Sequence, residues 1–218
     1  LGQVSPAQFI PMAEDLGLIT EVDNWVLKHA CQQRKKWLDD NVPCGRIAVN
    51  ISPLHFHQGD LIASVRTVLK ETNLPAELLE IEVTEGCFIK QMDNATNILK
   101  ELKSMGVKIA LDDFGTGFSS LSYLTSLPID IIKIDASFIA KLPSNFRESQ
   151  ITSAIIMLAH NLDLEIIAEG VENEAQKAFL MEHNCHIMQG FLFSKPDKAQ
   201  SFIRKITPYQ KLENEKEI

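Results

Sequence analysis

The sequence has no apolar run long enough to cross a bilayer, and its N-terminus has no basic stretch followed by an apolar one. These absences argue against a membrane span and a secretory signal peptide. We therefore expect a cytoplasmic location for this chain, with any membrane anchor in another part of a longer parent protein.

Cysteine and histidine are too scattered to form a recognisable metal motif. The four cysteines are far apart in the sequence and include no C-x-x-C pair, so we expect reduced thiols and no zinc site. Only His55 and His57 are closely spaced. We expect this pair on a loop surface rather than at a metal.

The chain also lacks an excess of basic residues. Its formal net charge of −8 argues against binding to a nucleic acid duplex, which requires a basic face. An anionic substrate would then need metal ions or a few local cations to attract it. No low-complexity linker divides the chain, so we expect one domain over residues 1–206 and a polar tail over 207–218.

What the sequence does contain is a repeated alternation of short apolar runs and longer helical patterns. This alternation predicts a parallel sheet covered by helices, and the number of repeats favours a barrel. The predicted strands are 46–52, 78–84, 107–113, 129–135, 165–170 and 187–193. The helices predicted between and after them are 60–73, 92–105, 119–126, 148–161, 173–183 and 197–205.

Two further helices are predicted before the first strand. The first begins at Ser5 and Pro6, with Gln8 placed to complete a capping box, and ends at Gly17. The second covers residues 20–40. Its apolar face is predicted to include Trp25, Val26, Ala30 and Trp37.

Polar side chains recur in one phase of the predicted strands. In a parallel barrel this phase points inward, and its residues near the strand C-termini face the mouth where active sites lie. Taken singly, each such residue is equally well explained as the solvent-facing end of an ordinary strand. The residues in this phase are Asn50, Glu82, Asp112, Lys133, Glu169 and Gln189.

These residues, with Asp113, offer oxygen ligands of the kind that Mg²⁺ or Mn²⁺ prefers. The pleat can break where a strand ends, so the adjacent Asp112 and Asp113 could both reach metal ions. Two ions sharing a carboxylate suit in-line attack on a phosphodiester, and Lys133 could hold the attacking water or offset negative charge in the transition state. The simpler reading of the aspartate pair alone is a solvated turn.

A glycine-containing segment follows these aspartates directly. Alone, it indicates a turn followed by a helix cap. Its position after two candidate ligands favours a mobile active-site loop. The predicted loop residues are Phe114, Gly115, Thr116, Gly117, Ser119 and Ser120.

The stretch from Asp112 to Leu124 (DDFGTGFSSLSYL) and the stretch from Leu127 to Asp135 (LPIDIIKID) closely resemble the central signature of the EAL family of phosphodiesterases. The resemblance runs in order from Gly2 to about Pro196. It also includes PAQFIPMAEDLGLI from Pro6, VNIS from Val49, EVTE from Glu82, AEGVE from Ala168 and MQGF from Met188.

The resemblance implies a modified (β/α)8 TIM-like barrel that hydrolyses cyclic di-GMP to linear pGpG with two Mg²⁺ or Mn²⁺ ions. It implies a homodimer and further domains in the parent protein, such as a GGDEF or sensor domain. The implied metal ligands are Asn50, Glu82, Asp112, Asp113 and Glu169. The implied catalytic residues are Lys133, Asp112, Asp113 and Glu169. The residues implied to support the metal site and substrate are Gln189, Glu172, Glu85, Asp135 and Pro196, with Glu85 also anchoring the loop that links the site to dimerisation.

One departure concerns the Glu-Ala-Leu motif that gives the family its name. It does not occur in this sequence, and the family spacing places it upstream of Leu1. We therefore expect the first two barrel strands to be missing from the chain and its activity to be impaired. The alternatives are a non-catalytic cyclic di-GMP receptor and a regulatory dimerisation module.

Overall fold

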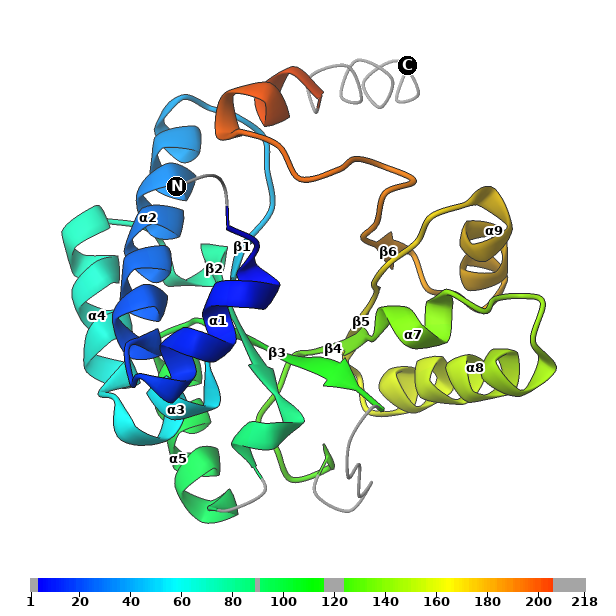
Figure 1. The fold of residues 1–218 in the computed structure, drawn as a ribbon, viewed down its shortest axis with the longest axis horizontal. Helices are drawn as coiled ribbons and strands as arrows, with labels where there is room; N and C mark the ends of the chain where they lie inside the picture. The colour runs from blue at the N-terminus through cyan, green and yellow to red at the C-terminus, as the bar shows by residue number, and fades with distance from the viewer. Residues whose placement is uncertain (1–3, 89–90, 116–123, 206–218) are drawn as a thin grey trace.

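The computed structural model describes residues 4–88, 91–115 and 124–205 (Figure 1). Six strands form one sheet in the order β1-β2-β3-β4-β5-β6, and every neighbouring pair is parallel. All six predicted strands are present, although the last is only two residues long. They are β1 Ile47–Asn50, β2 Leu79–Thr84, β3 Lys108–Phe114, β4 Ile131–Ile134, β5 Glu165–Ala168 and β6 Ile187–Met188.

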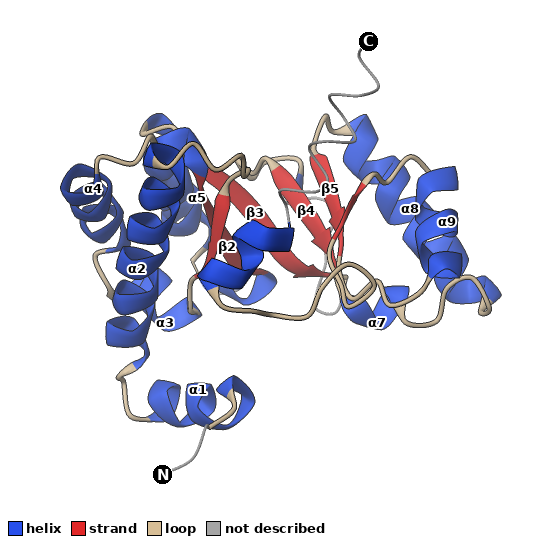
Figure 2. Cartoon of the chain, turned by 90° about the horizontal axis from the view of Figure 1, so that it is seen from above, coloured by secondary structure: helices blue, strands red, loops and turns tan. Residues whose placement is uncertain are grey.

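The sheet curls into a half-barrel with helices packed around it, which confirms the predicted fold class (Figures 1 and 2). Helices connect four of the five successive pairs of parallel strands, and the connection between β3 and β4 lies mostly outside the described residues. The helices over or beside the sheet are α4 Leu61–Thr72, α5 Met92–Ser104, α8 Phe146–Asn161 and α9 Glu174–Glu182, and a further helix covers 199–205. Of the predicted helix 119–126, all but the last three residues lie outside the described residues.

The two N-terminal helices are where predicted, but two of their details are wrong. Ser5 makes no side-chain capping bond to α1 Pro6–Asp15, so the predicted capping box is absent. In α2 Ile19–Asp39, Trp25 is 62% exposed and Val26 is also exposed. The buried face of α2 is instead formed by Ile19, Asp23, Leu27, Cys31, Arg34 and Trp37.

Short helices follow two of the strands and were not predicted. Ser52 caps α3 Pro53–Gln58 by accepting a hydrogen bond from the His55 N–H, and Pro53 occupies a first-turn position that needs no N–H donor. Asp135 caps α7 Ala136–Ile139 in the same way. The single-turn helices η1 and η2 cover Ala76–Leu78 and Glu85–Cys87.

The hydrophobic core lies between the sheet and its helices. Both phases of β2 are buried, because one faces the helices and the other faces the barrel interior. No helix in the described ranges combines the length and apolarity needed to cross a bilayer. The predicted tail 207–218 lies outside the described residues.

Candidate metal centre

The carboxyl ends of the first five strands carry polar side chains to one end of the half-barrel. Parallel strands have their carboxyl ends on the same edge, so residues distant in sequence meet there. Asn50 is the last residue of β1, and Glu169 directly follows β5. Glu82, Asp112 and Lys133 belong to the three strands between them, and all three are buried.

Lys133 occupies the centre of this acidic cluster. Its side chain is only 4% exposed, and its Nζ lies 2.7 Å from Glu82 Oε1 and 2.7 Å from Glu169 Oε1. Asp112 Oδ1 is 3.2 Å from the same nitrogen. One ammonium group thus contacts carboxylates from β2, β3 and the end of β5.

Asn50 joins the cluster through Glu82. Its Nδ2 donates a hydrogen bond of 2.7 Å to Glu82 Oε2, so the other oxygen of that carboxylate remains on Lys133. Asn50 and Glu82 are also paired in register across β1 and β2. The amide oxygen of Asn50 therefore belongs to a side chain already fixed beside the carboxylates.

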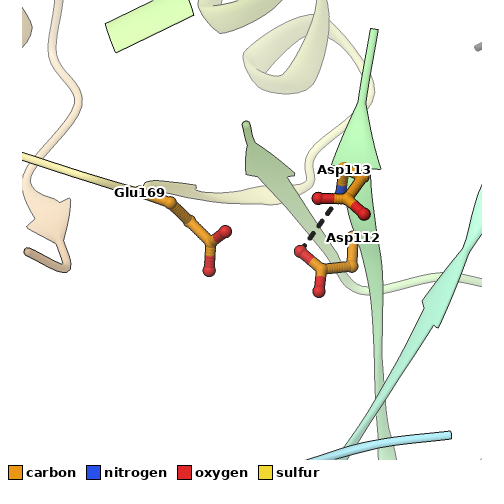
Figure 3. Close-up of side chains that lie close together, drawn as sticks. All are labelled: Asp112, Asp113 and Glu169. Atoms are coloured by element: carbon orange, nitrogen blue, oxygen red, sulfur yellow. Dashed lines mark hydrogen bonds between the residues drawn. The ribbon is translucent and has the colours of Figure 1, made fainter. Parts of the chain in front are cut away.

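Asp112 and Asp113 both reach the cluster because the strand becomes irregular between them. The pairing register of β3 with β4 shifts between Leu111 and Phe114, and Asp113 has a left-handed φ of 55°. This break cancels the usual alternation of neighbouring side chains. Oxygen atoms of Asp112, Asp113 and Glu169 all lie within 4.8 Å of one another, and the Asp113 N–H donates to Asp112 Oδ1 at 3.0 Å (Figure 3).

The electrostatics of the cluster favour binding of a cation. Burial raises the pKa of Glu82 and of Glu169, and Lys133 offsets only part of each rise. Burial and the neighbouring Asp112 raise the pKa of Asp113. Burial alone would lower the pKa of Lys133, but Glu82, Glu169 and Asp112 raise it on balance, so this residue stays protonated.

The donor set fits a hard divalent cation. It offers carboxylate and amide oxygens, and the group of mutually close ligand atoms found among the described residues contains no thiol or imidazole. Lys133 shows that a positive charge is accommodated between Glu82, Asp112 and Glu169. Three carboxylates contact this single ammonium group and a fourth, Asp113, lies beside two of them, which leaves negative charge for a further cation to balance.

Glu85 holds the start of the glycine-containing loop. Its Oε1 accepts a hydrogen bond of 3.1 Å from the Gly115 N–H, and its side chain is buried. Phe114 is buried at the end of β3. The other predicted loop residues, Thr116, Gly117, Ser119 and Ser120, lie outside the described residues.

The remaining predicted site residues are outside the set of described side chains that contact Lys133. Asp135 caps α7 and is close enough to Asp113 to raise its pKa. Gln189 pairs by its backbone with Ala168, beside Glu169. Glu172 and Pro196 are exposed in the segments after β5 and β6, and Gln189 is exposed as well.

Two residues near the site were missed. His55 is fully buried in α3, so the expectation of a loop surface is wrong. Its Nδ1 lies 3.4 Å from Oδ2 of the buried Asp23. A signal for Asp23 exists in the sequence, because it lies four residues from both Ile19 and Leu27 and therefore interrupts an apolar helical stripe.

The chain is similar to known proteins in both sequence and structure. Residues 1–196 match the EAL domain family. The chain is 43% identical over 197 residues to the signaling protein YkoW of Bacillus subtilis, covering 90% of the chain and 24% of YkoW. It is 43% identical over 205 residues to MucR of Pseudomonas aeruginosa, described as a bifunctional diguanylate cyclase/cyclic di-GMP phosphodiesterase, covering 94% of the chain and 30% of MucR.

A solved structure of the PaMucR phosphodiesterase in its c-di-GMP complex superposes with a TM-score of 0.88 and 44% sequence identity. The match covers 92% of this chain and 81% of that one. By contrast, the chain spans only about a quarter to a third of the length of the curated relatives named above.

Proposed function

The chain belongs to the EAL domain family, and from this premise we propose that it is the metal-dependent phosphodiesterase part of a longer protein, which hydrolyses cyclic di-GMP to linear pGpG. The observation that carries the proposal is the convergence of Glu82, Asp112 and Glu169 on Lys133 at the carboxyl ends of parallel strands. The relative MucR, with a similar sequence, is named as a cyclic di-GMP phosphodiesterase.

We assign Mg²⁺ or Mn²⁺, as two ions, to this acidic cluster. The residues that would hold them are Asn50, Glu82, Asp112, Asp113 and Glu169. When bound, such ions supply charge stabilisation at the phosphoryl oxygens and a more acidic water. Lys133 is protonated and buried beside the same carboxylates, so it is placed to orient the attacking water and to offset negative charge on the phosphoryl group.

The surrounding residues receive supporting roles in this proposal. Glu85 holds Gly115, the residue at the start of the loop and two positions after Asp113. Gln189 and Glu172 lie on segments that follow β6 and β5, where they border the open end of the half-barrel. Asp135 and Pro196 are the other two residues that we propose support the metal site and the substrate.

We also propose a homodimer and a reducing, cytoplasmic environment. A groove of about 560 Å³ beside the site is lined by apolar side chains of α7 and α8, including Phe138, Ile155 and Leu158, and Met157 at its edge is largely exposed. Such a surface suits self-association. All four cysteines are free, which supports a reducing compartment. Additional domains in the parent protein agree with the partial coverage of the relatives.

A product assay tests the enzymatic proposal. The purified full-length parent protein is incubated with cyclic di-GMP and Mn²⁺, and linear pGpG is measured by chromatography. We expect Asp112→Asn to abolish turnover, because it removes a charged oxygen from the cluster. Asp39→Asn, an exposed residue on α2, serves as a matched control and should retain activity.

The outcome also separates the enzyme from a receptor. Binding of cyclic di-GMP by the unmodified protein without any pGpG would replace the phosphodiesterase with the receptor alternative. Full activity of Asp112→Asn would remove the metal-binding role assigned to Asp112.

A further inference from the structure

A buried carboxylate outside the acidic cluster, that of Asp23, contacts the turn that follows β1. Asp23 is only 7% exposed and lies on the buried face of α2, between Ile19 and Leu27. Burying a carboxylate costs free energy unless hydrogen bonds replace its water shell. The hydrogen-bond partners of the Asp23 carboxylate therefore indicate its role in the fold.

One oxygen of Asp23 holds the turn that follows β1. Its Oδ2 accepts a hydrogen bond of 2.9 Å from the Ser52 N–H and another of 2.6 Å from Ser52 Oγ. Ser52 Oγ in turn accepts from the His55 N–H at 3.2 Å and so caps α3. Asp23 thus anchors both the backbone and the side chain of the residue at which the chain turns from strand to helix.

This anchored turn begins one residue beyond Asn50. Ile51, the residue between Asn50 and Ser52, donates its N–H to the Glu82 backbone oxygen at 3.0 Å. The Asn50 side chain donates to the Glu82 carboxylate. The strand end is therefore held by β2 on one side and by Asp23 on the other, and Asn50 lies between the two attachments.

We infer that Asp23 is a positioning residue of the metal centre, which fixes the end of β1 so that the Asn50 amide oxygen faces the cation. This inference rests on the proposed function, since it assumes a cation held by Asn50 and Glu82. A purely structural role would stabilise the packing of α2 against α3 without changing the affinity for metal.

Direct Mn²⁺ binding distinguishes these roles and needs no substrate. Free Mn²⁺ is titrated into the protein and followed by electron paramagnetic resonance. We expect Asp23→Ala to weaken binding about tenfold, the lower end of the loss seen when residues that orient metal ligands are removed. The matched control is Leu27→Ala, one turn further on the same buried face and fully buried.

Leu27→Ala removes buried contacts and should lower the melting temperature at least as much as Asp23→Ala. It should nevertheless leave the Mn²⁺ affinity of the folded protein unchanged. Equal weakening by both variants, or unchanged affinity in Asp23→Ala, would overturn the inference. Asp23→Asn keeps one acceptor oxygen and should recover part of the lost affinity.

Ser52→Ala provides a milder variant if Asp23→Ala does not fold. It removes the 2.6 Å hydroxyl bond but keeps the backbone bond to Asp23, so we expect a smaller loss of Mn²⁺ affinity. Unchanged affinity in both Ser52→Ala and Asp23→Asn would contradict the positioning role.

The design separates this inference from the proposed activity. If the unmodified protein binds Mn²⁺ but does not cleave cyclic di-GMP, the enzymatic proposal fails, and the Asp23 variants still report on the metal centre. If the unmodified protein binds no Mn²⁺, the metal centre is wrong, and the role of Asp23 falls with it.

Discussion

Lys133 is the residue that offsets the repulsion between the carboxylates of the acidic cluster in the folded chain. It is buried and shared by Glu82, Asp112 and Glu169. Without its ammonium group, carboxylates drawn together from different strands would repel one another in a setting of low polarity. The position for which we propose that Lys133 offsets phosphoryl charge also makes it an internal counter-ion.

Lys133→Met should therefore destabilise the metal-free protein. We expect a loss of roughly 3 kcal/mol in the free energy of unfolding, because buried carboxylates lose their charged partner. Urea denaturation measures this loss, and added Mn²⁺ should restore more stability to the variant than to the unmodified protein. Lys141→Met, which breaks an exposed ion pair with Glu148, should leave the stability almost unchanged. Similar losses in both variants would argue against the counter-ion role.

Glu169 gives the metal-free protein a measurable pH dependence. Burial raises its pKa above the ordinary value of 4.5, so the folded state binds this proton more tightly than the unfolded state does. Its favourable contribution is complete below 4.5 and is lost as the pH rises through the folded pKa. Glu169→Gln removes this titration.

We therefore expect the stability of Glu169→Gln, relative to the unmodified protein, to increase as the pH rises from about 4.5 through the raised pKa. Unfolding curves recorded in matched buffers without metal measure this difference at each pH. A difference that falls with rising pH would mean that the pKa of Glu169 is lowered instead.

At the scale of single elements, the ends of the strands matter more than their middles. β3 places two adjacent carboxylates on one side only because its pairing shifts at Asp112 and Asp113. The turn after β5 also has an unusual backbone conformation. Gly170, directly after Glu169, has a φ of 69°, and a Cβ there would lie 2.5 Å from the Cβ of Ala136.

Gly170→Ala should disturb this strand end. A side chain is strained at that φ and collides with α7, so we expect a loss of roughly 3 kcal/mol in stability. The displacement of Glu169 should also weaken Mn²⁺ binding. Gly45→Ala is the control, because a Cβ at Gly45 meets nothing within 4 Å. Thermal unfolding compares the two, and equal melting temperatures would show that the turn adapts without cost.

At the scale of the whole molecule, ion pairs also join separate strands at the end of the half-barrel opposite the acidic cluster. Arg46, just before β1, donates its Nε to Glu80 of β2 at 2.9 Å and its Nη2 to Glu165 of β5. β1 and β5 are not neighbours in the sheet. This ion network therefore joins two distant parts of the curled sheet, at the end away from the metal centre.

Arg46→Gln should cost about 2 kcal/mol in stability, because the buried Glu80 loses its charged partner. Glu165→Gln should cost less, because its side chain is partly exposed. A double-mutant cycle of the two, followed by urea denaturation, should give a favourable coupling that weakens with added salt. Strictly additive losses would show that the pair does not join β1 to β5.

Local sequence patterns were sufficient for the order of the strands and for most of the cluster. Alternating apolar residues mark each strand, and the polar residue near its end falls in the inward phase, as Asn50, Glu82 and Lys133 show. The same local reasoning placed Trp37 correctly on the buried face of α2 but wrongly included Trp25 and Val26. Trp25 and Val26 are apolar, but nothing in the helix itself distinguishes their side from the side that contains Leu27.

The sequence by itself determined the family, the parallel half-barrel and the acidic residues of the site, because each of these depends on motifs or periodicities within a few neighbouring residues. Only the tertiary structure decided that Asp23 holds Ser52, that Lys133 lies among three carboxylates and that Arg46 reaches Glu165. These contacts join residues far apart in the chain, and their geometry is set by how the curled sheet and its helices pack together.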